Sequence, residues 1–238
     1  MYDVISLHDS IFDSKNISNI NFINCVSTGK AKNFITLADC ERVKLSGCSH
    51  INMNVDYQKG LINTQRNCEQ IIIENSNFKL YDAYSIINSV DGGENVNEFK
   101  IINCEFDLKD TNTYIFRYMR EATICNCNFN LTSSSKRKVT FFYSDSGQIN
   151  LIKNINFIDC TILGDENTII DNIVSCNSDF EDNILINKCD IVNKVRDTRV
   201  VELQKNYSKV IIMNSNFYSY DAIYDTSKEV TIFNANVK

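Results

Sequence analysis

Hydrophobic and polar positions follow an imperfect repeat along most of this chain of 238 residues. The repeated phrase is apolar-x-apolar-x-Asn-small-x-apolar, and its copies are on average about 26 residues apart. Periodicity of this length is typical of solenoids, in which each repeat buries its apolar side chains against its neighbours. Nine copies begin at Ile20, Val43, Ile71, Phe99, Ala122, Ile155, Ile184, Val210 and Val230, and their small residues are Cys25, Cys48, Ser76, Cys104, Cys127, Cys160, Cys189, Ser215 and Ala235.

The alignment of these copies predicts one β-strand in each copy, followed by a bend. The positions five and three residues before the small residue are apolar in every copy, as the inward face of a strand requires. The alternation then slips by one residue. A bend in the left-handed conformation, which Asn tolerates, keeps the following side chains in register. We expect this bend at Asn24, Gly47, Asn75, Asn103, Asn126, Asp159, Lys188, Asn214 and Asn234.

Another strand is predicted before the first one in every copy. Its four-residue segments begin at Val4, Phe34, Leu61, Ile86, Ile115, Phe141, Ile169, Val200 and Ala222. The second residue of each segment should point inward and the third should point outward. Strands that return in the same order stack in parallel, about 4.8 Å apart. The apolar columns therefore become continuous ladders within one core.

With this coil pattern and its recurring asparagines, the chain resembles the pectate-lyase-like superfamily. The resemblance covers residues 3–238 and rests on the pattern of the repeat. It implies an all-β fold, a right-handed single-stranded parallel β-helix (solenoid) of about nine coils with an internal ladder of asparagines and cysteines. We expect residues 1–238 to form a single domain.

Charge and hydropathy narrow the range of partners and locations. The net charge of −6 argues against a duplex-binding protein, because phosphate neutralisation needs clustered Lys and Arg. The N-terminal segment MYDVISLHDS lacks the basic and apolar regions of a secretory signal, and no segment approaches membrane-spanning length. We therefore expect no nucleic-acid partner, no membrane, and a location in a virion or in the cytoplasm.

The ten cysteines and two histidines indicate neither a metal centre nor a cofactor. Six cysteines occupy the inward small position, where a reduced thiol acts as a small buried hydrophobe. Cys125 is an outward residue before the bend at Asn126 and Cys127 is the inward small residue after it, so the two thiols point to opposite faces and cannot chelate one metal ion. With only His8 and His50, Ser-His or Cys-His catalysis has little basis, and we expect structural histidines.

One outward column carries candidate chemistry, and its members are Arg117, Tyr143, Asp171 and Glu202 on four consecutive coils. Neighbours in this column should lie about 5 Å apart. Asp171 beside Glu202 would raise the proton affinity of one carboxyl group, and their spacing would suit catalysis by a retaining glycoside hydrolase. Arg117 and Tyr143 would then bind substrate, with the arginine holding an acidic sugar. The alternative for this column is a solvated face of mixed charge.

The signature motifs of two groups of enzymes on this fold are absent from the chain. Polygalacturonase-like members carry an Asn-Thr-Asp triplet, an Asp-Asp pair and a Gly-His-Gly triplet, and none of these occurs here. Pectate-lyase-like members use an Arg-x-Pro-x-x-Arg stretch, and this chain has no proline. The resemblance therefore implies neither activity, and whether the chain is an enzyme stays open.

The outer face of the Asn-containing strand carries an apolar stripe formed by Ile23, Ile72, Ile102, Cys125, Ile158, Leu185, Ile211, Met213 and Phe233. Such a stripe is larger than an unpartnered surface normally exposes, which indicates burial by another subunit or by the chain's own loops. No capping helix is predicted at either end. We therefore expect a homo-oligomer (a trimer) or a partner protein that covers an open edge.

An acidic, apolar-striped β-helix without catalytic signatures resembles the shaft or receptor-binding module of a bacteriophage tailspike or fibre. That resemblance implies a structural role and contact with bacterial surface polysaccharide. One alternative is a polysaccharide-degrading enzyme, a glycoside hydrolase or lyase, with Asp171 and Glu202 as its catalytic residues. Another alternative is a scaffold or inhibitor that docks a protein on its flat face.

Overall fold

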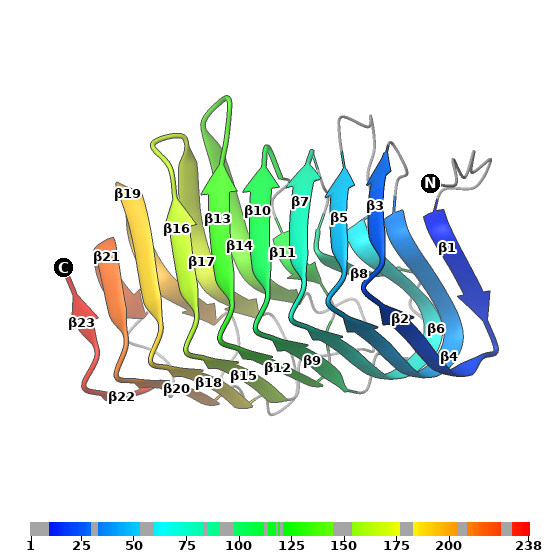
Figure 1. The fold of residues 1–238 in the computed structure, drawn as a ribbon. Coiled ribbons are helices and arrows are strands. Elements are labelled where there is room, and N and C mark those ends of the chain that lie inside the picture. Colours follow the sequence, from blue (N-terminus) through cyan, green and yellow to red (C-terminus); the bar gives the residue numbers. More distant parts are fainter. Residues whose placement is uncertain are drawn as a thin grey trace.

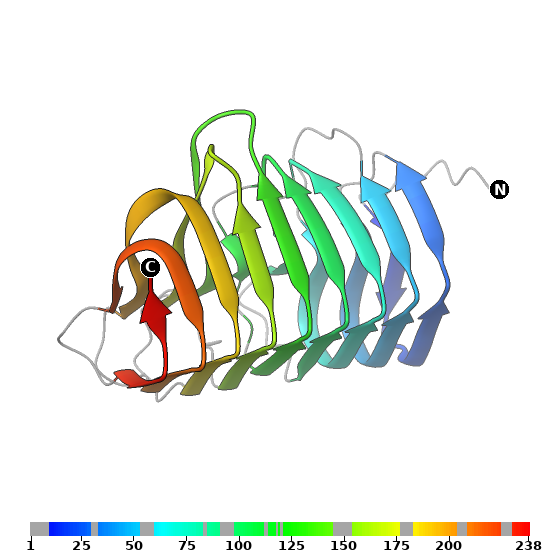
Figure 2. The ribbon, with the colours of Figure 1, turned by 60° about the vertical axis from the view of Figure 1, so that its left-hand side comes forward.

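The computed structural model describes residues 10–29, 33–52, 60–82, 85–90, 98–111, 114–117, 119, 121–144, 154–176, 183–203, 209–224 and 230–238. These residues form an all-β, right-handed parallel β-helix whose coils stack along one axis, with β1 and β23 at its opposite ends (Figure 1). A view from nearer the axis shows the successive coils one behind another (Figure 2). The predicted fold class is confirmed.

Each of the nine described coils contributes one strand to each of three faces, which are named here in chain order. The first face contains β1 (Ser10–Lys15), β8 (Ile87–Val90), β11 (Tyr114–Arg117), β14 (Arg137–Ser144) and β17 (Thr168–Cys176). The second face contains β2 (Ser18–Ile23), β9 (Phe99–Ile102), β12 (Glu121–Cys125), β15 (Asn154–Ile158), β18 (Asn183–Asn187), β20 (Lys209–Met213) and β22 (Val230–Phe233). The third face contains β3 (Val26–Gly29), β5 (Ser49–Asn52), β7 (Asn77–Tyr81), β10 (Glu105–Lys109), β13 (Asn128–Thr132), β16 (Thr161–Gly164) and β23 (Asn236–Val237).

Four longer strands turn a corner and belong to two faces. They are β4 (Asn33–Ser46) and β6 (Gly60–Glu74), which run from the first face to the second, and β19 (Asp190–Leu203) and β21 (Asn216–Tyr224), which run from the third face to the first face of the next coil. Every pairing along the axis is parallel, as the repeat predicted.

The predicted bend between the second and third faces is present in all nine coils. Its residue has a positive φ each time, from 49° at Asn214 to 62° at Gly47. The asparagine amides lie on the outer side of the bend and bond along the axis, with the Nδ2 of Asn103 donating to the Oδ1 of Asn75 at 3.1 Å. A Cβ on Gly47 would lie 2.3 Å from the Oδ1 of Asn24, so a larger residue there would force the Asn24 side chain to move.

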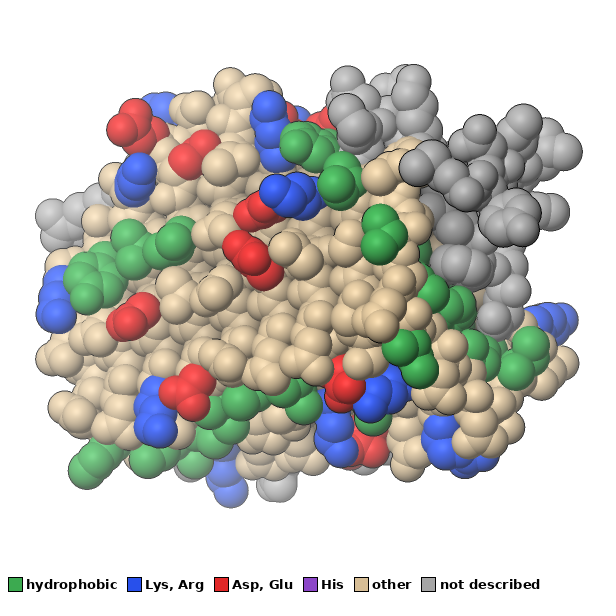
Figure 3. Space-filling view, in the orientation of Figure 1, with side chains coloured by type: hydrophobic (Ala, Val, Ile, Leu, Met, Phe, Trp, Pro, Cys, Tyr) green, Lys and Arg blue, Asp and Glu red, His purple; other side chains and the backbone are tan. Residues whose placement is uncertain are grey.

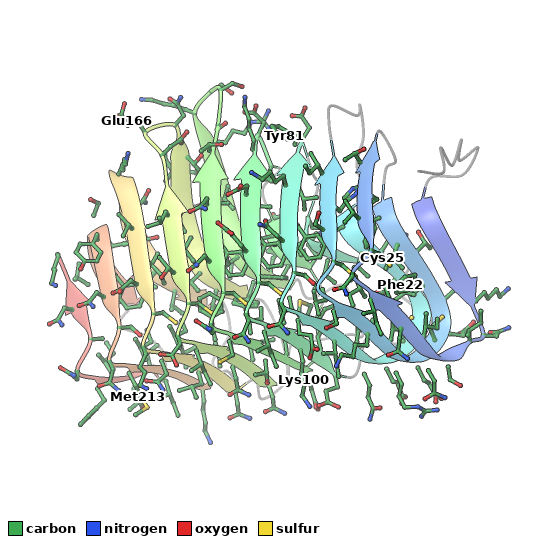
Figure 4. The ribbon with its side chains drawn as sticks, in the orientation of Figure 1. Phe22, Cys25, Tyr81, Lys100, Glu166 and Met213 are labelled. Atoms are coloured by element: carbon green, nitrogen blue, oxygen red, sulfur yellow. The ribbon has the colours of Figure 1, made fainter. Side chains whose placement is uncertain are left out.

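The core is the sum of the inward ladders. On the second face, Ile73, Ile101 and Ile124 are adjacent in register and completely buried. The inward cysteines are also buried, apart from the half-buried Cys25, and the thiol of Cys127 lies 3.3 Å from the carbonyl oxygen of Cys125. In Figure 4 the side chains of Met213 and Lys100 project away from the second face on its outer side. The predicted inward and outward positions of this face are therefore confirmed.

On the third face, the inward position is a column of aromatic rings that begins with His50 and continues with Phe78, Phe106 and Phe129. The rings of Phe106 and Phe129 are stacked with their centroids 5.0 Å apart. His50 is 1% exposed and stacks on Phe34 at 5.0 Å, so it is a core residue. This structural placement of His50 was predicted.

The first-face register is as predicted in the central coils and differs at three coils. Phe142 pairs with Val174 and not with Ile170, because Arg137 already pairs with Thr168 and the β14–β17 ladder shifts by one further residue between Val139 and Thr140. Further differences are that Tyr224, in place of Ile223, pairs with Val201, and that Phe12 pairs with Ile35 in the first coil. The predicted strand at residues 4–7 lies outside the described residues.

Candidate functional site

The middle of the first face brings Arg117 and Tyr143 together on neighbouring strands. The inward residues Phe116 and Phe142 are buried and stacked at 5.2 Å, which fixes the register of β11 against β14. The next residue of each strand must point outward. Arg117 and Tyr143 are therefore directly opposite each other, as the sequence predicted, and each is half-buried.

Tyr114 completes this cluster and was not identified from the sequence. Its ring stacks on that of Tyr143 with 3.8 Å between centroids and 19° between planes. The guanidinium carbon of Arg117 lies 5.5 Å from the centroid of the Tyr114 ring, within the range of a cation–π interaction. Tyr114 stands three residues before Arg117, and an aromatic residue recurring near the outward column on adjacent coils is the signal that could have found it. We call these three residues the Tyr–Arg cluster.

The predicted catalytic pair does not come together. Tyr143 is followed in its column by Ser175, and Ser175 is the residue that pairs with Glu202. Asp171 stands four residues before Ser175 on β17, and its Oδ1 accepts a hydrogen bond from the Nζ of Lys138 at 3.0 Å. The expectation that Asp171 neighbours Glu202 is therefore wrong, because β17 pairs with β19 through Val174, Ser175 and Cys176 and not through Ile170 and Asp171. The side chain of Glu202 lies outside the described residues.

A polar network anchors the corner from which β11, β14 and β17 start. The Oδ1 of Asp110 accepts hydrogen bonds from the hydroxyl of Ser133 at 2.9 Å and from the backbone N–H of Ser134 at 2.6 Å. Burial alone would raise the pKa of Asp110, but these hydrogen bonds outweigh it and hold the pKa below its ordinary value. Arg137 donates to the carbonyl oxygen of Asp110 at 2.7 Å. The strands that carry the Tyr–Arg cluster thus begin from a fixed corner.

Asp165 holds the neighbouring loop in the same way. Its carboxylate accepts hydrogen bonds from the backbone N–H groups of Ser133 and Thr168 at 2.9 and 2.7 Å. Burial would raise the pKa of Asp165, and these hydrogen bonds lower it below its ordinary value. The loop between β13 and β14 and the loop between β16 and β17 project beyond the coils, on the side where Glu166 is labelled (Figure 4).

The thiols take part in packing. The described cysteines form no disulfide with one another and are buried, or half-buried in the cases of Cys25 and Cys125. Burial raises the pKa of the Cys68 thiol to about 11, so it is protonated at neutral pH. Within the described ranges, no group of three His, Cys, Asp or Glu side chains could hold a metal ion. In that same part of the chain no helix is long and apolar enough to span a membrane.

Comparisons with known proteins do not assign a family. No protein-family model matches the chain, and no curated protein sequence matches it. Among solved structures, the chain is similar to trypsin-treated QnrB1, a plasmid-mediated fluoroquinolone resistance protein, with 12% sequence identity and a TM-score of 0.21, over 93% of this chain and 91% of that one. This likeness is too distant to bear on function, so function must be inferred from the geometry of the surface.

Proposed function

We propose that this protein is a structural, receptor-binding β-helix of the kind found in bacteriophage tailspikes and fibres, and that it contacts bacterial surface polysaccharide. The observation that carries the proposal is the Tyr–Arg cluster, with its stacked rings and its guanidinium on the outer side of the first face. Acidic sugars of the polysaccharide bind there. The virion is the corresponding location.

The chemistry of the cluster suits an acidic sugar. An aromatic ring offers a large, rigid apolar surface with a polar tip, and the C–H face of a pyranose can pack on it. A guanidinium group presents a planar fork that binds a carboxylate through two parallel hydrogen bonds. Because Arg117 already lies over Tyr114 and both strands are held by the core, little conformational freedom is lost on binding.

The test is affinity electrophoresis through gels that contain hyaluronan, alginate, polygalacturonate or polysialic acid. We expect at least one of these polymers to retard the wild-type protein. Arg117→Gln and Tyr143→Ala should each weaken that binding about tenfold, which corresponds to about 1.4 kcal/mol. Thermal melts of each variant verify that the fold is intact.

Lys138→Gln is the matched control, because it removes one positive charge from the same face without touching the cluster. Lys138 pairs with Asp171 and is more than half exposed. If Lys138→Gln weakens binding as much as Arg117→Gln, attraction to net charge explains the retardation and the site is refuted. Wild-type protein that none of the four polymers retards would also contradict the proposal.

Polysaccharide cleavage has less support than binding. Asp171 and Glu202 were expected side by side as the catalytic carboxyl groups. The register instead places Ser175 beside Glu202. Asp171 is engaged with Lys138. No described feature of the first face substitutes for the missing pair.

A homo-oligomer, a trimer of solenoids packed side by side, is favoured by the apolar stripe on the second face. Hydrophobic side chains follow the lower edge of the molecule in Figure 3. Ile23 and Phe233, at the two ends of the stripe, are each 64% exposed, and Ile211 is 41% exposed. A stripe that follows the whole axis fits a second copy of the same elongated solenoid better than a compact partner.

Light scattering tests this assembly. We expect a trimeric mass for the wild type and a lower mass for Ile211→Asp, because a buried unpaired charge opposes the contact. Thr132→Asp, on the outer side of the third face and outside the stripe, is the control for an added charge on an exposed polar residue. A monomeric wild type would contradict the proposal.

A further inference from the structure

A shallow groove of about 440 Å³ lies on the outer side of the bend between the second and third faces, on three consecutive coils. It is far from the Tyr–Arg cluster in the coil, since β11 and β14 belong to the first face. Five of the eight lining residues are asparagines, and the others are Ser76, Cys104 and Glu105. In Figure 3 the corresponding surface is a band of uncharged polar groups that crosses the front of the molecule.

One row of the groove is the asparagine ladder. The Nδ2 of Asn103 donates to the Oδ1 of Asn75 at 3.1 Å, and the Nδ2 of Asn126 donates to the Oδ1 of Asn103 at 2.8 Å. A side-chain amide has two N–H donors and two acceptor lone pairs. Asn103, in the middle of the row, therefore keeps one N–H and one lone pair that no described residue uses. These groups repeat with the spacing of the coils.

A second row lies beside the first, on the opening residues of the third-face strands. Asn77, Glu105 and Asn128 are adjacent in register, and all three are exposed. The Nδ2 of Asn77 donates to the Oε2 of Glu105 at 3.4 Å. The second row therefore adds a carboxylate acceptor and further amide donors.

The backbone of the groove contributes little to recognition, because its groups bond between coils. The N–H of Glu105 donates to the carbonyl oxygen of Ser76 at 3.0 Å, and the N–H of Asn128 donates to that of Cys104 at 3.0 Å. Recognition must therefore come from side-chain amides and one carboxylate, each offering hydrogen bonds to a ligand that can both donate and accept.

The lining residues include no Lys, Arg or His, so the groove has no positive charge to hold a phosphate or an acidic sugar. Glu105 disfavours anions further. Hydroxyl groups both donate and accept, and match amides in this respect. The repeat of the rows, about 4.8 Å per coil, is similar to the advance per ring of an extended β-1,4-linked glycan, so one ring can lie over each coil. Successive rings are turned relative to each other, and both edges of each ring carry oxygen atoms that can bond to amides.

We propose that this amide groove binds an extended, uncharged, β-1,4-linked glycan lying parallel to the axis of the solenoid. The glycan hydroxyls bond to the two rows, one ring to each coil. The inference does not rest on the Tyr–Arg cluster, which lies on another face and selects acidic sugars.

The test uses affinity electrophoresis with hydroxyethyl cellulose, carob galactomannan and arabinoxylan as extended neutral glycans, and with dextran as a flexible neutral glycan. We expect retardation of the wild type by at least one of the first three and none by dextran. The double variant Glu105→Ala with Asn128→Ala removes one carboxylate and one amide from exposed strand positions, and should weaken this binding at least tenfold.

The matched control is Asp190→Ala with Asn216→Ala, in the same row but outside the groove. Asn216 donates to Asp190 at 2.8 Å there, which parallels the Asn77–Glu105 contact. The control should bind as the wild type does. Absence of retardation by all three extended glycans, equal retardation by dextran, or unchanged binding of the groove variant would each overturn the proposal.

The acidic-sugar site at the Tyr–Arg cluster and the neutral-glycan site in the amide groove can be refuted independently of each other. Loss of neutral-glycan binding in the groove variant with intact binding of acidic polymers supports two independent sites. A groove variant that loses both activities would show that a single surface is responsible, and would contradict the groove as a separate site.

Discussion

His50→Phe is the substitution that tests the description of the core most sharply. His50 is 1% exposed, and its Nδ1 lies 2.8 Å from the hydroxyl oxygen of Ser27. Its Nε2 is buried without a hydrogen-bond partner among the described residues. The next two residues in its column are Phe78 and Phe106, so a phenyl ring continues a stack that already exists.

The expected change in the free energy of unfolding with pH follows from the pKa of the His50 imidazole. Burial lowers the pKa of His50 from 6.5 to about 4, because the charged ring loses its hydration. The unfolded chain therefore binds one more proton than the folded protein between these two values. Stability is complete above pH 6.5 and falls as the pH approaches 4, by about 3 kcal/mol from this group.

The His50→Phe variant has no imidazole, so its stability lacks this dependence on pH. At pH 7 it loses the hydrogen bond to Ser27, worth about 1 kcal/mol, and no longer buries an unsatisfied Nε2, which costs about 1–3 kcal/mol. We therefore expect the variant to be as stable as the wild type at pH 7, or more stable by about 1 kcal/mol. At pH 4 its advantage should be larger by about 3 kcal/mol.

Urea denaturation followed by circular dichroism at pH 7, 6, 5 and 4 measures this difference. The carboxylates titrate in both proteins, so their contribution cancels when the two free energies of unfolding are subtracted. A difference that stays constant within about 0.5 kcal/mol from pH 7 to pH 4 would refute the burial of a neutral histidine in the column.

Two further predictions concern the bends and the glycan. Gly47→Ala should destabilise the protein by about 1–2 kcal/mol, because the φ of Gly47 is 62° and the new Cβ would contact Asn24. Lys188→Gly should stabilise the protein by about 1 kcal/mol, because glycine adopts the φ of 54° found there without strain. Thermal melts that shift in the same direction for both variants would contradict the left-handed bends. Raising the salt concentration should weaken binding of the acidic polymer at Arg117 and leave neutral-glycan binding unchanged, which affinity electrophoresis at two ionic strengths measures.

The second face could be predicted from the sequence because each of its strands ends at a conformationally distinctive residue. The left-handed bend fixes where the alternation slips, so Asn103 and Asn126 align their coils without reference to loop length. The inward column also has small side chains that are unambiguous in the repeat. These two signals, one from the backbone and one from packing, agree in every coil.

The first face lacks such a marker, and its register could not be predicted in every coil. In β17, the pairs Ile169-Ile170 and Ile173-Val174 are both apolar and both precede a polar residue. A period-two pattern cannot choose between them, and in the structure Val174, from the second pair, lies opposite Phe142. The column therefore continues through Ser175, and the expected carboxylate pair is lost.

The Tyr–Arg cluster was predicted in part for a related reason. Arg117 and Tyr143 share a column, and columns follow from the repeat. Tyr114 reaches Tyr143 from a position three residues away, and such a diagonal contact depends on side-chain rotamers that a repeat pattern does not specify.

A crystal structure of the protein with a bound oligosaccharide, from whichever acidic polymer retards it, is the most direct test of the proposed function. We expect a sugar ring on Tyr143 with its carboxylate on the guanidinium of Arg117. A sugar bound only on the second or third face, with the Tyr–Arg cluster empty, would contradict the proposal.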